Sequence, residues 1–176
     1  ESLVAHRRET DAMIEALDIL LEDAMNDKAL TVEEIGEILG KADFAAHQSE
    51  AEERYGDTDD WRESRVRTAS WQAADWRQNA ERFQDIECRM IDAICDGAAP
   101  DSERAAGLVE EHREALSEFF PVTPAKHYIM SRGYIHDERF REHYDSQQVG
   151  FAQWLADAIE AVARQQGVDL ESPTWE

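Results

Sequence analysis

Long apolar runs are missing from this 176-residue sequence, and so is a starting methionine. No apolar run approaches the roughly 18 residues that a membrane-spanning helix requires, so we predict no membrane span. Residues 1–8 include a glutamate, a histidine and two arginines, and these interrupt the apolar stretch that a secretory signal peptide needs. Because the chain begins with Glu1, we expect it to be a fragment or a processed form of a longer protein.

Catalytic and metal-binding motifs are also missing. There is no glycine-rich loop before a helix, no Cys-x-x-Cys and no His-Glu-x-x-His. The spacings between His112, His127, His136 and His143 are 15, 9 and 7 residues, which do not form a compact ligand pair on one helix face. We therefore predict no metal, no cofactor and no enzymatic activity, and we interpret these histidines as core or surface residues.

Cysteine is scarce, with only Cys88 and Cys95 in the chain. They are seven residues apart on a predicted helix, so their Cα atoms are separated by on the order of 10 Å, too far for a disulfide. We expect two buried thiols in a reducing compartment, and hence a cytoplasmic protein.

Basic residues are outnumbered by acidic ones, with 18 Lys and Arg against 40 Asp and Glu and a net charge of −22. Such a surface repels phosphate, so direct binding of DNA or RNA by this segment is unfavourable. If the parent protein binds DNA, another domain must do so. The acidic residues are typical of a solvated surface, and they also favour cationic or neutral ligands.

Helical periodicity extends over nearly the whole chain, and no segment shows a convincing strand alternation, so we predict an all-α fold. Residues 1–27 carry a seven-residue repeat through Leu3, Thr10, Leu17 and Ala24, which is typical of a coiled-coil helix that forms a dimer. The alternative is a helix that packs onto its own domain. We assign 28–167 to one helical domain and 168–176 to a tail.

Capping residues predict where the helices of this domain begin and end. We expect Gly40 and Gly56 to terminate the first two helices, and Pro121 to stop the helix that precedes it. The predicted starts are the capping box Thr31–Glu34, Asp43, the acidic run 57–60, Ser70 or a neighbour, Ser102, Thr123-Pro124 and Gln148, with a short amphipathic segment over 134–145.

Aromatic residues gather in two regions, one from Phe44 to Trp76 and one from Phe119 to Tyr134. Rings of this kind usually build a core. Tyr55 and Trp61, however, flank a glycine and an acidic loop, where tight packing is less expected, and aromatic walls are also how apolar, ring-rich ligands are held. We hypothesise that residues 31–70 are loosely ordered alone and close over a ligand.

Three motifs resemble one known family. Residues 52–64 read Glu-Glu-Arg-Tyr-Gly-Asp-Thr-Asp-Asp-Trp-Arg-Glu-Ser, residues 110–113 read Glu-Glu-His-Arg, and residues 134–140 read Tyr-Ile-His-Asp-Glu-Arg-Phe. In combination they are similar to the TipAS-type antibiotic-recognition domain, the drug-sensing half of certain MerR-type transcription activators, over about residues 43–165. The resemblance implies a globin-like all-α fold with a cleft for thiopeptides or other bulky antibiotics.

The same resemblance implies partners that this chain does not contain. Full-length relatives carry an upstream winged helix-turn-helix and a long dimerisation helix, so residues 1–27 would be the end of that helix. We therefore hypothesise a ligand-sensing domain of a homodimeric activator that binds DNA only through an upstream domain. The alternatives are a stand-alone drug-sequestering resistance protein and, less favoured, a haem-binding globin relative.

One position departs from the family pattern. Thiopeptide-binding members place a cysteine that adds to the drug where this sequence has Val122, and valine has no thiolate. We therefore expect binding without a covalent bond. The residues expected to contact the ligand are Phe44, Tyr55, Asp57, Trp61, Arg65, Trp71, His112, Phe119, Phe120, Val122 and Tyr134.

Overall fold

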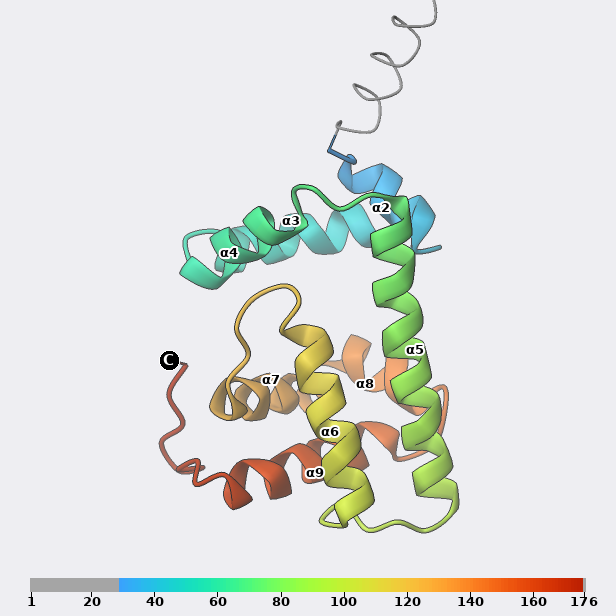
Figure 1. Cartoon of the computed structure of the whole chain (residues 1–176), viewed down its shortest axis with the longest axis vertical. Helices are drawn as coiled ribbons and strands as arrows, with labels where there is room; N and C mark the ends of the chain where they lie inside the picture. Colours follow the sequence, from blue (N-terminus) through green and yellow to red (C-terminus); the bar gives the residue numbers. More distant parts are fainter. Residues whose placement is uncertain (1–28, 176) are drawn as a thin grey trace, which may run out of the picture.

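A computed structural model describes residues 29–175 and, within them, contains α-helices and no strand (Figure 1). The all-α prediction is thereby confirmed, whereas the seven-residue repeat of 1–27 lies outside the described residues. The helices are α2 (Val32–Ile38), α3 (Phe44–Tyr55), α4 (Asp59–Thr68), α5 (Ala73–Cys95), α6 (Glu103–Leu116), α7 (Pro124–His136), α8 (Glu138–Asp145) and α9 (Phe151–Gln165).

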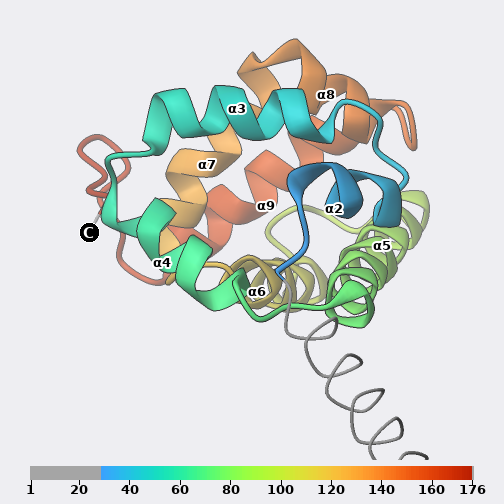
Figure 2. The same cartoon turned by 90° about the horizontal axis from the view of Figure 1, so that it is seen from above.

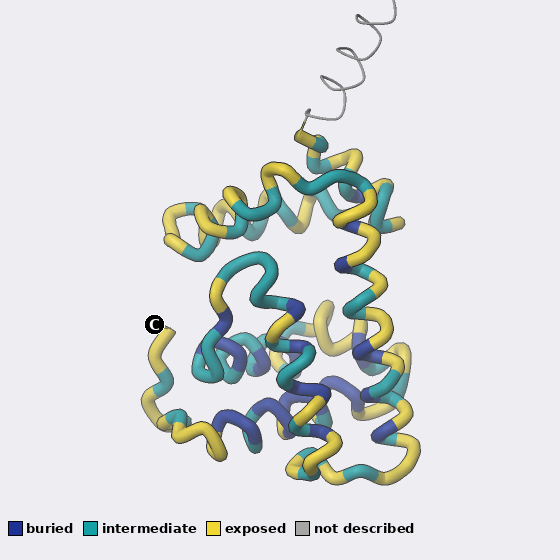
Figure 3. Tube along the Cα trace, viewed as in Figure 1, coloured by how far each residue is buried: buried dark blue, intermediate teal, exposed yellow. Residues whose placement is uncertain are grey.

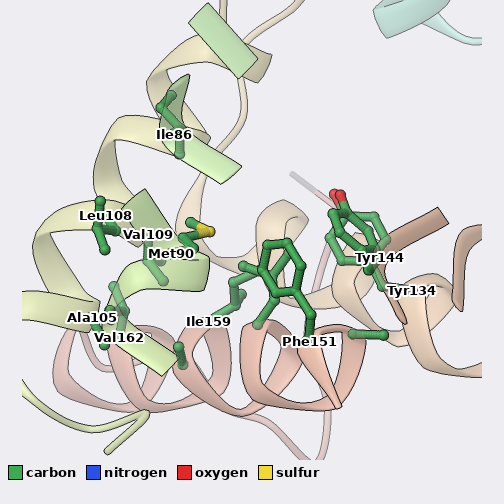
Figure 4. Packing of buried hydrophobic residues seen from close by; sticks show 14 of the residues in the cluster. Ile86, Met90, Ala105, Leu108, Val109, Tyr134, Tyr144, Phe151, Ile159 and Val162 are labelled. Carbon is green, nitrogen blue, oxygen red and sulfur yellow. The ribbon is translucent and has the colours of Figure 1, made fainter. Parts of the chain in front are cut away.

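The hydrophobic core lies between α5, α6, α7, α8 and α9, which we call the core helices. Helix α9 is its centre, with eight buried residues that include Phe151, Leu155 and Ile159. Met90 of α5 is fully buried and points toward Phe151 and Ile159 of α9 (Figure 4). The apolar residues of α9 thus form one face of the helix, and α5, α6, α7 and α8 pack around α9.

A chain of aromatic rings extends the core through α7, α8 and α9. The ring of Tyr144 lies 5.3 Å from that of Tyr134 and 5.1 Å from that of Phe151, measured between centroids. Both separations are typical of favourable ring contacts. Beside these rings, the Gln147 side-chain amide donates a 2.9 Å hydrogen bond to Glu87 of α5, so a buried carboxylate has a partner.

Helices α2, α3 and α4 form a separate layer, residues 32–68, which we call the N-terminal layer. It lies across one end of the core helices, over α7 and α9 when seen from above (Figures 1 and 2). Neither α3 nor α4 contains a buried residue, and most of the layer is half-buried or exposed (Figure 3). The polar contacts that join it to the core helices include Glu50 with Arg139, Asp60 with Lys126, and Arg67 with the Ser117 carbonyl.

Several predicted helix starts are confirmed. Thr31 and Glu34 form the expected capping box of α2, with the Thr31 amide donating to the Glu34 carboxylate at 2.7 Å. Gly40 follows α2 at φ +64, a left-handed conformation that suits glycine. Ser102 caps α6, and Thr123 caps α7 with Pro124 in its first turn.

Other boundary predictions were wrong in detail. Asp43 precedes α3 but its side chain makes no capping hydrogen bond. The acidic run 57–60 does open α4, which begins at Asp59, but the capping side chain is that of Thr58, whose hydroxyl accepts from the Trp61 amide. Gln72 instead of Ser70 precedes α5, and α6 ends at Leu116, well before Pro121.

The cysteine prediction was half right. Both thiols are free, as their spacing on α5 requires, but Cys88 and Cys95 are exposed and not buried. The buried stripe of α5 passes instead through Ile86, Met90 and Ala93, so the cysteines face away from the core. Within the described residues, no helix is both long and apolar enough to cross a membrane.

Candidate functional site

Three aromatic rings meet where the N-terminal layer joins the core helices. Trp71 lies between α4 and α5, and its ring centroid is 4.9 Å from that of Trp76 and 5.3 Å from that of Phe119. Phe119 belongs to the connection between α6 and α7. The backbone amide of Trp71 donates to the Thr68 carbonyl at 3.0 Å, which ties the first ring to the end of α4. The cluster therefore links both layers at this corner.

A surface hollow of about 600 Å³ opens beside this cluster. This volume lies within the range of small-molecule sites, which runs from roughly 300 to 1,000 Å³. Trp71 supplies its aromatic wall, whereas its rim is polar and carries both signs of charge. The lining residues are Trp71, Asp75, Gln78, Asn79, Glu81, Arg82 and Glu118.

The polar rim is held in place by contacts between α5 and the end of α6. The Asn79 amide donates to Glu118 at 2.7 Å, and the Arg82 guanidinium also donates to Glu118. Arg82 also lies 3.5 Å from Glu114. The Glu118 carboxylate thus has two donors, one of them charged, which fixes its position at the edge of the hollow.

A buried pair of histidines lies deeper in the core helices. Nδ1 of His112 on α6 is 2.9 Å from Nε2 of His127 on α7, so one ring donates a hydrogen bond to the other. Burial lowers the pKa of His112 to about 4, and burial together with the His112 and Arg113 charges lowers the pKa of His127. Both rings are therefore neutral near pH 7.

This pair does not form a metal site with its surroundings. Over residues 29–175, no group of three or more His, Cys, Asp or Glu side chains is positioned to bind a metal ion. The flanking groups are rings, with Phe83 at 5.7 Å and Tyr134 at 6.2 Å from the His112 ring. The pair is best described as a hydrogen-bonded part of the core.

The residues expected to contact a ligand differ in exposure. Tyr55, Asp57 and Arg65 are exposed on or beside α3 and α4, and His112, Val122 and Tyr134 are buried. Ring contacts bring together Trp71 with Phe119, and His112 with Tyr134. The other five members of the set are half-buried: Phe44, Trp61, Trp71, Phe119 and Phe120.

Sequence reasoning missed three residues that join the N-terminal layer to the core. The Lys126 ammonium donates to both carboxylate oxygens of Asp60 at 2.8 Å, and the Trp175 indole donates to the same carboxylate at 2.6 Å. Trp175 was assigned to a tail, and the tail does lie beyond the last helix. A lone tryptophan in a polar tail was the available signal, because a large ring is costly to leave fully in water.

Comparisons with known proteins agree with this architecture. The family model of the TipAS antibiotic-recognition domain matches residues 47–162. The HTH-type transcriptional activators TipA of Streptomyces coelicolor and of Streptomyces lividans are each 30% identical over 164 residues, which cover 93% of this chain. The matched region is 65% of either activator, so the chain spans somewhat less than two thirds of their length.

A solved structure of TipAS from Streptomyces lividans in complex with nosiheptide, described as part of a thiopeptide antibiotic multidrug resistance system, has a similar fold. The similarity has a TM-score of 0.70 at 31% identity, and it covers 78% of this chain and 97% of that one. Sequence, fold and the extent of the match therefore agree, and this chain belongs to the TipAS antibiotic-recognition domain family.

Proposed function

We propose that this domain binds a bulky, largely apolar antibiotic of the thiopeptide class, reversibly, between the N-terminal layer and the core helices. The observation that carries this proposal is the match to the nosiheptide-bound TipAS structure over 97% of that chain. The domain acts as a sensor and has no enzymatic role. The proposed aromatic contacts are Trp61 and Tyr55 from the layer, Trp71 and Phe119 from the corner cluster, and Phe120 beside it in the sequence.

The packing of the N-terminal layer supports this location. Helices α3 and α4 bury no residue, whereas α9 buries eight, so the two layers differ in how much apolar contact holds them. A layer attached mainly by polar contacts can separate from the core and return at low energetic cost. A ring-rich ligand between the layers would add the apolar contact that α3 and α4 lack.

Reversible binding follows from the residue at position 122. Val122 is 3% exposed, and its carbonyl accepts a 2.9 Å hydrogen bond from Arg113. A valine offers no nucleophile to an electrophilic drug. The chain's two thiols, Cys88 and Cys95, are exposed on α5, whereas Val122 lies in the connection between α6 and α7.

Relay to a promoter requires parts beyond the described residues. We propose that residues 1–27 dimerise and that an upstream domain binds DNA. A ligand shifts such a system only through its different affinities for two conformations. Closure of the N-terminal layer, which residues 29–31 connect to the dimer segment, supplies the two conformations.

Thermal unfolding with nosiheptide tests the binding proposal. At saturating nosiheptide we expect the melting temperature to rise by roughly 5 °C or more, since a ligand at about 100 times its Kd adds about 2.7 kcal/mol. Trp61→Ala should lose most of this rise. The matched control is Val149→Ala, whose side chain is 87% exposed in the loop before α9. No rise with either wild type or control would refute the proposal.

A second function has support in the description of the solved relative as part of a resistance system. The domain would then sequester the drug without acting on a promoter. Both functions require the same binding site, so only the coding sequence before Glu1 can distinguish a sensor from a sequestering protein. A reading frame that encodes a helix-turn-helix before Glu1 favours the sensor, and one without it favours sequestration.

A further inference from the structure

The C-terminal tail returns from the end of α9 to the N-terminal layer. In Figure 1 it turns upward from α9 toward α4. Its last described residue, Trp175, donates its indole N–H to Oδ2 of Asp60 at 2.6 Å. Asp60 lies in the first turn of α4, 115 positions earlier in the sequence. The tail therefore contacts one of the two helices that contain no buried residue.

The same carboxylate forms the most buried ion pair between the two layers. Nζ of Lys126 on α7 lies 2.8 Å from both oxygens of Asp60, and the side chains of Lys126 and Asp60 are only 10% and 18% exposed. Such a pair is held strongly only while water is kept out, because screening by solvent weakens an exposed pair. What covers the pair therefore contributes to how firmly α4 is held, together with the hydrogen bond from Arg67 to the Ser117 carbonyl.

Two aromatic rings cover it. The ammonium of Lys126 is 5.7 Å from the ring centroid of Trp175 and 5.9 Å from that of Phe120, both within cation–π range. Phe120 belongs to the core side, between α6 and α7, whereas Trp175 arrives from the tail. Trp175 thus does two things: it shields the pair and it donates a hydrogen bond to the carboxylate.

We propose that the C-terminal tail is a latch, in which Trp175 closes over the Asp60–Lys126 pair and holds α4 against α7. Helix α4 contains no buried residue of its own, so its attachment depends on contacts of this kind. Releasing the latch frees α4 and leaves the core helices packed, because no member of the fully buried core is in the tail.

Hydrogen–deuterium exchange on the full chain, without ligand, tests the latch. In Trp175→Ala we expect α4 amides to exchange roughly tenfold faster, which is the loss expected when a hydrogen bond to a charged group disappears. Amides of α9 should exchange as in wild type. Thr174→Ala, an exposed neighbour in the same tail, is the matched control and should leave α4 unchanged.

Two further variants separate the parts of the contact. Trp175→Phe keeps a ring over the ammonium but loses the N–H donor, so its α4 exchange should fall between wild type and Trp175→Ala. Lys126→Met removes the ion pair, and combining it with Trp175→Ala should add little, because both changes remove one shared network. Unchanged α4 exchange in Trp175→Ala would overturn the latch, and so would equal acceleration in α4 and α9.

The functional consequence rests on the proposed function. If the drug binds the state in which α4 is held against α7, Trp175→Ala should weaken nosiheptide binding. The fold-increase in Kd should about equal the fold-increase in the exchange rate of the α4 amides. The two failures are distinguishable. A latch without drug binding shows fast α4 exchange but no nosiheptide response in any variant, whereas binding without a latch shows equal affinity in wild type and Trp175→Ala.

Discussion

At the scale of single residues, the neutral pair of His112 and His127 makes stability depend on pH. The folded pKa of His112 is lowered to about 4, below its usual value of 6.5. Between these values the unfolded chain binds more protons than the folded one, so stability rises with pH and falls on acidification. His127 acts in the same direction because its pKa is also lowered.

We expect the free energy of unfolding to fall by about 1.5 kcal/mol from His112 alone between about pH 6.5 and pH 5. Urea unfolding at a series of pH values measures this. In the double variant His112→Leu with His127→Leu, the fall should be smaller, since both partners are replaced together. His47→Gln, on exposed α3, is the control, and an unchanged slope in the double variant would contradict the assignment.

Glu87 sets the lower limit of that pH window. Burial raises the pKa of its carboxyl, but hydrogen bonds with His143 and Gln147 outweigh this, and the net pKa lies below the usual value of 4.5. A lowered carboxyl pKa means that its stabilising contribution is present above about pH 4.5 and is lost as the pH falls through the folded value. Measurements above about pH 5 therefore report on the histidines.

A substitution at Val122 should give the protein a covalent reaction with the drug. The family resemblance matches Val122 to a cysteine that adds to the drug, so Val122→Cys should form a covalent adduct with nosiheptide. Intact-mass spectrometry should show a mass increase of one nosiheptide in the variant and none in wild type, despite the exposed Cys88 and Cys95. An adduct on wild type would contradict reversible binding.

At the scale of helices, α9 and α4 represent two kinds of attachment. Phe151 in α9 is fully buried and packs against Tyr144, whereas Val66 in α4 is 73% exposed. Phe151→Ala should cost about 3–5 kcal/mol of unfolding free energy, through lost contacts and a cavity. Val66→Ala should change it by less than about 0.5 kcal/mol.

Urea unfolding followed by circular dichroism compares these two variants. The comparison is valid only if the denaturant slope stays the same, since a changed slope signals a changed unfolded state or a lost two-state transition. Phe151→Leu, which keeps most of the apolar volume, should lose less than Phe151→Ala. Equal costs at Phe151 and Val66 would contradict the division into an embedded core and a surface layer.

Local chemistry in the sequence was sufficient for much of the helix pattern. The side chains of Thr31, Ser102 and Thr123 each accept a hydrogen bond from an amide in the first turn of a helix. The starts of these helices could therefore be predicted without any tertiary contact. Asp43 and Ser70 show the limit. Aspartate and serine are both common capping residues. Which side chain reaches the free amides, however, depends on the backbone conformation at the start of the helix, and neither Asp43 nor Ser70 caps here.

The candidate site was less predictable than the helices. Aromatic composition indicated Trp71 and Phe119, which the structure brings to 5.3 Å, but not that Trp76 joins them as a third ring. Cys88 and Cys95 were assigned to the core because cysteine is usually buried, whereas the α5 stripe turns them outward. The contact of Trp175 with Asp60 spans 115 positions, and no local pattern encodes it.

At the scale of the whole molecule, the well-packed core helices support an N-terminal layer whose contacts with them include ion pairs and hydrogen bonds. The core cluster runs from Ile86 to Val162, and nothing in it comes from α2, α3 or α4. This division suits a protein that must hold its fold while one layer responds to a ligand. The net charge of −22 keeps the outer surface hydrated and leaves the ring-lined corner as the apolar contact region.

Hydrogen exchange with and without nosiheptide tests the central proposal most directly, with the intact mass measured on the same samples. We predict that nosiheptide slows exchange mainly over residues 32–68 and the connection that holds Phe119 and Phe120, while α9 amides stay unchanged and the protein mass shows no adduct. Slowed exchange on another face, or none at concentrations that saturate TipAS, would contradict drug binding between the two layers.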